Sequence, residues 1–87
     1  MSEDEKLELA LIWLKNEYIK ATKKFGKFHN AHEGYAVLLE EVDELWENVK
    51  LNQHTHTGRD SLMLMEAIQV GAMALRFIID CCGDDSP

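Results

Sequence analysis

The 87-residue sequence has few of the residues that interrupt helices or cross-link loops. Its one proline is the last residue, and its five glycines leave three long segments without internal breakers. The only two cysteines, Cys81 and Cys82, are adjacent, so they can neither join two distant elements nor supply a spaced pair of metal ligands. A disulfide scaffold is therefore excluded, and both thiols are expected to be reduced.

Basic residues and long uncharged segments are also scarce. Nine Lys and Arg against sixteen Asp and Glu give a net charge of −7, which repels the backbone of nucleic-acid polymers. No run of eighteen uncharged apolar residues occurs, and the first five residues lack the basic start of a secretory signal. With 46% hydrophobic residues the chain is apolar enough to fold. We expect one domain over residues 1–87, a cytoplasmic location, and neither nucleic-acid polymers nor membranes as partners.

The first long segment has the apolar spacing of a helix. Its apolar positions recur at intervals of three and four residues, which places them along one face. Ser2 and Glu5 have the spacing of a capping box, and Gly26 is a natural stop. The pattern predicts a helix over residues 4–25. Its seam consists of Leu7, Leu11, Leu14, Tyr18, Ala21 and Phe25.

Two further helices are expected. Asn30 and Glu33 have capping-box spacing before a helix that runs to about Leu51. A polar connection follows, and Asp60 can cap a third helix over residues 61–82, which Gly83 ends. The expected core stripe of the second helix consists of Tyr35, Leu38, Leu39, Val42, Leu45, Trp46 and Val49.

The third predicted helix is apolar around almost its whole circumference. Glu66, Gln69, Arg76 and Asp80 occupy a single narrow polar strip. Two short helices cannot cover such a helix, so a further partner is expected on it. The fold class that follows is all-α, with three main helices per protomer and a helical bundle completed by homo-oligomerisation, as a dimer or tetramer.

Acidic residues gather between positions 40 and 47. Glu41 and Glu44 lie one helical turn apart on a flank of the predicted second helix, so both carboxylates project the same way. Glu66 and Gln69 have the same spacing on the polar strip of the third helix. Mg²⁺ and Mn²⁺ prefer oxygen ligands, and these two helices together would supply them. Such Mg²⁺ sites commonly hold substrate phosphates.

Simpler interpretations of these residues stay open. The acidic run on the second helix can be a solvated face, and Glu66 can pair with Arg76, Lys50 or Arg59. The pairs His29–His32 and His54–His56 suggest zinc, but both cysteines lie far along the chain from them. The sequence has no phosphate-cradling glycine loop and no Ser or Cys nucleophile arrangement.

Two motifs resemble a known family. The segment Glu40-Glu41-Val42-Asp43-Glu44 is similar to an EExxE motif, and Glu66-Ala67-Ile68-Gln69 is similar to an ExxD motif. Together they resemble the MazG-like all-α nucleoside triphosphate pyrophosphohydrolases, in particular short phage and bacterial members, over about residues 29–80. The resemblance implies dimers or tetramers that cleave a nucleoside triphosphate between the α and β phosphates with Mg²⁺.

The resemblance also implies roles for individual residues. Glu41, Glu44 and Glu66 correspond to Mg²⁺ ligands, and Glu41 or Glu44 would act as the catalytic carboxylate on water. Gln69 stands where the motif has Asp, which removes one negative ligand while keeping an oxygen. The leaving pyrophosphate requires positive charge, and the nearest candidates are Lys50, Arg59, Arg76 and the basic cluster Lys20, Lys23, Lys24 and Lys27. His32 is a further candidate, for a phosphate contact. The substrate-binding candidates are Lys50, Arg59, Arg76, Lys27 and His32.

The sequence therefore predicts a leading function and one alternative. The first is a Mg²⁺-dependent hydrolase that converts a canonical or modified (d)NTP to the monophosphate and pyrophosphate. The alternative is a non-catalytic helical module that forms homo-oligomers and whose acidic face is merely solvated. Gln69 and the small size of the chain favour the alternative.

Overall fold

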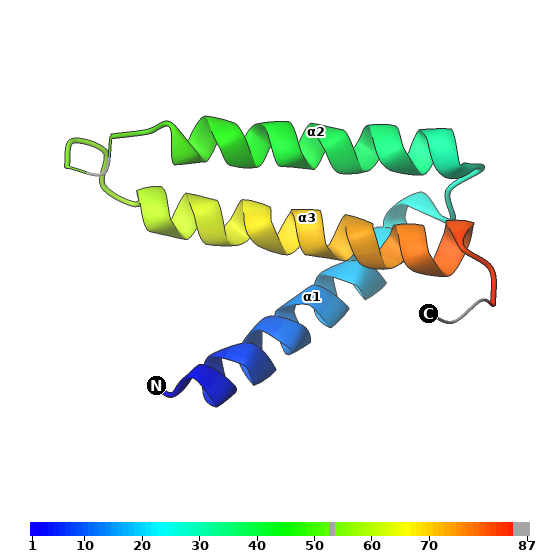
Figure 1. Ribbon diagram of the computed structural model, residues 1–87, viewed down its shortest axis with the longest axis horizontal. Coiled ribbons are helices and arrows are strands. Elements are labelled where there is room, and N and C mark those ends of the chain that lie inside the picture. The colour runs from blue at the N-terminus through cyan, green and yellow to red at the C-terminus, as the bar shows by residue number, and fades with distance from the viewer. Residues whose placement is uncertain (53, 85–87) are drawn as a thin grey trace.

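The described part of the chain is arranged as three helices (Figure 1). The computed structural model describes residues 1–52 and 54–84, and these contain α1 (Glu3–Phe25), α2 (Ala31–Val49), α3 (Arg59–Cys81) and no strand. α2 and α3 run antiparallel and side by side, and α1 crosses α3 at an angle. The predicted all-α, three-helix architecture is confirmed.

The N-terminal ends of the first two helices follow the predicted capping. The Ser2 hydroxyl accepts a hydrogen bond from the Glu5 amide at 3.1 Å, and the Glu5 carboxylate accepts one from the Ser2 amide at 3.2 Å. Asn30 caps α2 by accepting from the Glu33 amide at 2.9 Å. The Glu33 carboxylate reaches back one residue further than a capping box requires, to the His29 amide. These bonds satisfy amides that have no partner within the helix.

The predicted cap of the third helix is wrong. α3 begins at Arg59, two residues before the predicted start, and Gly58 rather than Asp60 occupies the N-cap position. Gly58 has φ of 85°, a conformation that glycine adopts without a steric penalty. The polar connection thus turns directly into the helix, and Asp60 lies in the first turn beside Arg59.

α3 is the central element, because α1 and α2 both pack on it rather than on each other. The polar strip of α3 faces the groove between those two helices. Four apolar side chains are buried where the elements meet, and two of them come from α3. They are Ala21, Phe28, Ala72 and Met73.

The apolar seam of α1 is covered along only half of its length. Leu14 packs against Gly71, and Tyr18 and Ala21 contact the buried cluster. Leu7 and Leu11 belong to the same seam but are 58% and 56% exposed, because the N-terminal half of α1 diverges from α3 (Figure 1). Phe25, the last residue of the seam, is 67% exposed as well, so only the stretch of Leu14, Tyr18 and Ala21 is packed.

The expected core stripe of α2 divides in the same way. Leu38 and Leu45 are partly buried, whereas a neighbouring line of apolar side chains is exposed. The exposed line consists of Tyr35, Leu39, Val42 and Trp46. A single copy of the chain therefore leaves a large part of its apolar surface in contact with solvent.

α3 also passes a test for membrane-spanning helices by length and composition. Its mean hydropathy over an 18-residue window is 1.7. A mostly buried helix of a soluble protein passes the same test. Both other helices pack on α3, but only 17% of that window is buried.

The position of Gly34 provides a test of the packing between α2 and α3. A Cβ atom there would lie 2.9 Å from the Phe77 ring and 3.1 Å from the Phe28 ring. An exposed helix position normally gains about 1 kcal/mol when Gly is replaced by Ala. We expect Gly34→Ala to lose roughly 1–3 kcal/mol instead, because the two rings must move.

Urea denaturation followed by circular dichroism measures this difference. Ala36→Gly, at an exposed position of the same helix, is the control and should lose about 1 kcal/mol through helix propensity alone. A stabilised Gly34→Ala variant would contradict the packing described here.

Candidate metal centre and adjoining cavity

Three carboxylates from two helices converge on one point. Glu41 and Glu44 project from successive turns of α2, and the antiparallel pairing brings Glu66 of α3 opposite them. One oxygen from each of the three lies within 4.8 Å of the other two. The structure thus brings together three of the four predicted metal-site residues.

No basic side chain neutralises this cluster among the residues that the structure describes. The three ion pairs found there involve His29, Lys50 and Arg59, with Glu33, Glu47 and Asp60 as their acids. Glu66 Oε2 is buried and receives no hydrogen bond from a donor group of the described chain. The alternative in which Glu66 pairs with Arg76, Lys50 or Arg59 is therefore not what the structure shows.

The carboxylates consequently share a proton in the metal-free chain. Burial, followed by hydrogen bonding to Glu41 and Glu44 and their negative charge, raises the pKa of Glu66 to about 8. The pKa of Glu41 is also raised, mainly by burial, although a hydrogen bond from Glu66 partly opposes the shift. A proton on Glu66 makes that group the donor to Glu41.

A divalent cation fits this cluster on chemical grounds. Three carboxylate oxygens at mutual distances below 4.8 Å match the reach of a hard cation with ligand distances of about 2.0–2.1 Å. The buried Glu66 oxygen without a donor is an atom that such a cation would satisfy. Glu41, Glu44 and Glu66 are the residues that would hold it.

Gln69 lines the adjoining cavity together with Glu41 of the cluster. Its amide nitrogen donates a hydrogen bond to the Glu17 carboxylate of α1. Its carbonyl oxygen is therefore the only Gln69 atom suited to contact a cation. The contact also ties α1 to the polar strip of α3 at the point where the two helices begin to diverge.

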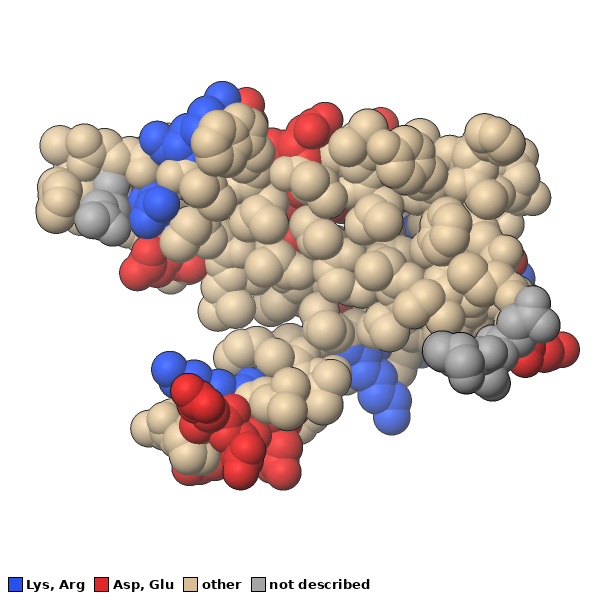
Figure 2. Space-filling model, viewed as in Figure 1, with Lys and Arg blue, Asp and Glu red and all other residues tan. Residues whose placement is uncertain are grey.

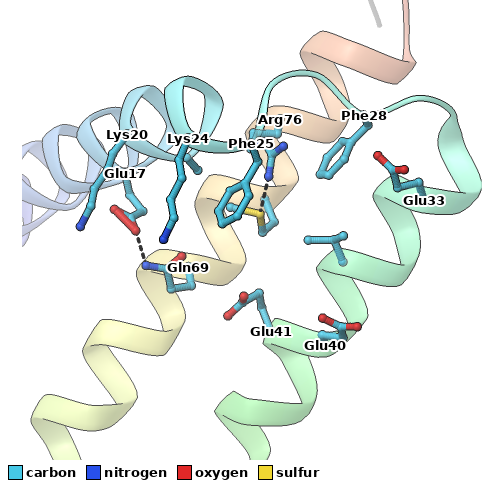
Figure 3. A pocket seen from close by; sticks show the side chains of 13 residues that line it. Glu17, Lys20, Lys24, Phe25, Phe28, Glu33, Glu40, Glu41, Gln69 and Arg76 are labelled. Atoms are coloured by element: carbon cyan, nitrogen blue, oxygen red, sulfur yellow. Dashed lines mark hydrogen bonds between the residues drawn. The ribbon is translucent and has the colours of Figure 1, made fainter.

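A cavity of about 580 Å³ opens next to the carboxylates, in the groove between α1 and α2 (Figure 3). Its floor is the polar strip of α3, and Glu41 belongs both to its wall and to the metal cluster. Lys20 and Lys24 line the cavity from α1, and Lys24 points toward Gln69 (Figure 3). The lining residues are Glu17, Lys20, Ala21, Lys24, Phe25, Phe28, Glu33, Val37, Glu40, Glu41, Gln69, Met73 and Arg76.

Arg76 is the buried cation of this cavity. Its side chain is 3% exposed, lies 4.1 Å from the centre of the Phe28 ring and donates to the Gly26 carbonyl at 2.9 Å. None of the ion pairs in the described part of the chain includes Arg76, and its Nε atom is buried without a hydrogen-bond partner. A buried guanidinium without a carboxylate is costly, so this wall of the cavity favours an anion.

The other four predicted substrate contacts do not line this cavity. Lys50 pairs with Glu47 at 2.9 Å, and Arg59 donates to the Val49 carbonyl at 2.9 Å. Lys27 and His32 are exposed. Arg59 lines a second, more open cavity of about 430 Å³ together with His54 and His56.

Sequence reasoning did not place the aromatic residues or Glu17 in this site. Phe25 was assigned to the seam of the first helix, yet it is exposed and lines the cavity. The sequence pattern indicated Lys20 and Lys24 only as members of the basic cluster Lys20, Lys23, Lys24 and Lys27. The available signal was their position, since Glu17, Lys20 and Lys24 occupy one flank of α1 at intervals of three and four residues.

Comparison of the chain with models of protein families, with curated proteins and with solved structures finds no match. The resemblance to the MazG-like family therefore stays a prediction.

The shared proton predicts how stability depends on pH. The unfolded chain releases the Glu66 proton near pH 4.5, whereas the metal-free folded chain keeps it up to about pH 8. The contribution of Glu66 to the free energy of unfolding is therefore greatest at or below pH 4.5, and it declines as the pH rises toward 8. Glu66→Gln replaces the protonated carboxyl with a neutral amide and should remove this decline.

Thermal melting in chelator at pH 5.5 and 8.0 tests the prediction. We expect the melting temperature of the parent to fall, by roughly 4–8 °C for each kcal/mol of stability lost in a domain of this size. The control Asp43→Asn alters an exposed acid outside the cluster and should keep the decline. Equal pH dependence in the parent and Glu66→Gln would contradict the proton assignment.

Proposed function

We propose that the chain is a Mg²⁺-dependent nucleoside triphosphate pyrophosphohydrolase, for which Mn²⁺ can replace Mg²⁺. Its substrate is a canonical or modified (d)NTP, and its products are the nucleoside monophosphate and pyrophosphate. The observation that supports this most is the adjacency of two features: three carboxylates without a neutralising base, and a cavity with a buried, unpaired Arg76. A cytoplasmic location accompanies the proposal.

The charges of the cavity are suited to a polyphosphate. Lys20, Lys24 and Arg76 supply positive charge to the cavity, while Glu41 belongs to a cluster suited to a cation. An isolated acidic site would repel phosphate, and an isolated basic site would not recruit a metal. The combination binds a metal–phosphate complex, and a volume of about 580 Å³ lies within the usual range for small-molecule sites, about 300–1,000 Å³.

The aromatic residues of the cavity suit the remainder of the substrate. Phe25 is exposed at the cavity wall, where a planar base can lie against its ring. The Phe28 ring is already covered by Arg76, which it holds in place. Phe28 therefore positions the guanidinium. Phe25 carries Lys24 Nζ 5.1 Å from its ring centre but is 67% exposed, whereas Phe28 is buried, so Phe25 is the better candidate for base contact.

The proposed reaction is an in-line attack of water on phosphorus. A new phosphorus–oxygen bond forms to the water oxygen, and the bond from the same phosphorus to the bridging oxygen of the α–β anhydride breaks. Glu41 or Glu44 orients the water and accepts its proton. Lys20, Lys24 and Arg76 stabilise the charge on the leaving pyrophosphate. When bound, the divalent cation supplies charge neutralisation at the phosphate oxygens.

Activity against a panel of NTPs and dNTPs with Mg²⁺ tests the proposal. We expect release of monophosphate and pyrophosphate, with kcat falling by roughly 10²–10⁴-fold in Glu41→Gln because a proton acceptor is lost. Asp43→Asn should stay within about twofold of the parent, as surface substitutions usually do. The proposal fails if no nucleotide is cleaved, or if Glu41→Gln retains full activity.

The effect of Mg²⁺ on the melting temperature distinguishes the hydrolase from the alternative, a non-catalytic helical module. Mg²⁺ that binds only the folded chain raises the melting temperature with concentration. We expect such a rise at pH 8.0 in the parent and in Asp43→Asn, and none in Glu66→Gln. A melting temperature that does not respond to Mg²⁺ in any of the three proteins would favour the module.

A further inference from the structure

The hydrogen bond between Gln69 and Glu17 joins two residues that lie 52 positions apart in the sequence. Gln69 follows Glu66 of the metal cluster by one turn of α3, and Glu17 lines the cavity from α1. We propose that Glu17 is a positioning residue of the metal centre: it directs the Gln69 carbonyl oxygen toward a divalent cation and supplies the negative charge that Gln69 lacks. The inference rests on the metal centre of the proposed function and adds to it a residue from α1.

The hydrogen bond fixes which way the Gln69 amide faces. An ionised carboxylate only accepts hydrogen bonds, so the Gln69 atom that faces Glu17 is the amide nitrogen. The amide oxygen therefore points elsewhere. In Figure 3 Gln69 lies between Glu17 and Glu41, with its nitrogen on the Glu17 side. The oxygen is thus the Gln69 atom available to a ligand in the space beside Glu41.

The helical spacing brings Gln69 within reach of the cluster. Side chains three residues apart on a helix are neighbours, with roughly 5–6 Å between their Cβ atoms. Gln69 has this relation to Glu66, and Glu41 lines the same cavity from the opposite helix. Mg²⁺ prefers six oxygen ligands, so three carboxylates leave room for an amide oxygen.

Glu17 retains a negative charge that can act on this site. None of the ion pairs in the described residues includes Glu17, although Lys20 lies one turn further along the same helix. Glu17 and Gln69 are both partly buried, where a charge acts more strongly than in bulk water. A carboxylate that accepts from an amide also polarises it, which makes the carbonyl oxygen a better ligand for a hard cation.

The position of Glu17 offsets the glutamine at position 69. Glu41, Glu44 and Glu66 supply three carboxylates, and an aspartate in place of Gln69 would supply a fourth. The chain has its fourth carboxylate on α1 instead, one hydrogen bond away from the Gln69 amide. Outer groups of this kind orient metal ligands and tune their basicity. The negative charge close to the cation is therefore still that of four carboxylates.

A purely structural role for the hydrogen bond, as a tie between α1 and α3, makes a different prediction. A tie needs a hydrogen bond but no charge, and α1 is also held by the packing of Leu14 on Gly71. Glu17→Gln separates the two roles, because the new amide oxygen still accepts from Gln69 while the charge is lost. Only the role at the metal predicts weaker metal binding in this variant.

Binding of Mn²⁺ alone to the full chain at pH 8.0 tests the inference, with Mg²⁺ as a competitor. Electron paramagnetic resonance measures the free Mn²⁺ that remains. We expect Glu17→Gln to bind Mn²⁺ about 10–100-fold more weakly than the parent, the usual effect of removing an outer partner of a ligand. Thermal melting without metal should show that this variant is folded.

Glu8→Gln is the matched control. It makes the same substitution at an exposed position of the same helix. The N-terminal end of α1, with its group of acidic side chains, is separated from α2 and α3 by an open gap (Figure 2). Mn²⁺ affinity in this variant should stay within about twofold of the parent, as is usual for surface substitutions.

Exchange of the two side chains provides a rescue. Glu17→Gln combined with Gln69→Glu keeps the total charge and allows the same hydrogen bond with donor and acceptor reversed. The carboxylate then lies on α3, at the ligand position itself. The double variant should therefore bind Mn²⁺ at least as tightly as the parent.

Three results would overturn the inference: parent-like Mn²⁺ binding by Glu17→Gln, an equal loss in Glu8→Gln, or a double variant that binds no better than Glu17→Gln. None of these results depends on nucleotide cleavage. If the parent cleaves nucleotides and Glu17→Gln binds Mn²⁺ normally, only the role of Glu17 is wrong. If Glu17→Gln binds Mn²⁺ weakly as expected but the parent cleaves no nucleotide, only the proposed hydrolase is wrong.

Discussion

The antiparallel contact between α2 and α3 is the interaction on which the other features of this structure depend. Gly34 permits it, because the Phe77 and Phe28 rings occupy the space that a side chain would fill. The contact fixes the register that places Glu66 of α3 against Glu41 and Glu44 of α2. It also divides the apolar residues of both helices between a side that packs inside the structure and a side that is exposed. A shift of one helical turn would separate the carboxylates.

The cost of burying acidic groups connects this packing to chemistry. Burial first, and then the negative charge of the neighbouring carboxylates, disfavours ionisation in this site, and the pKa values of Glu41 and Glu66 are raised as a result. Arg76 lies nearby as a buried cation without a carboxylate partner, which is also unfavourable. The chain keeps these charges apart although pairing them would relieve both. A cation on one side and an anion on the other would resolve both conflicts together.

The local patterns of the sequence predicted the helices well. Periodicity and the Ser2 and Asn30 caps placed α1 and α2 within two residues of their observed ends, because these bonds form within one or two turns. The start of α3 was wrong, since the left-handed Gly58 competes with Asp60 for the cap position. The convergence of Glu41, Glu44 and Glu66 was also correct, because the polar strip of an otherwise apolar helix has few directions in which it can face.

The sequence by itself determined the three helices, their apolar sides and the identity of the three clustered acids, all of which depend on spacing along one chain. Only the tertiary structure decided which apolar side is covered. It directed Gln69 to Glu17, left Leu7 and Trp46 exposed, and enclosed Arg76 beside Phe28 rather than beside an acid. The crossing angle of α1 over α3 sets these outcomes, and that angle arises from contacts between residues some fifty positions apart, such as Arg76 with the Gly26 carbonyl.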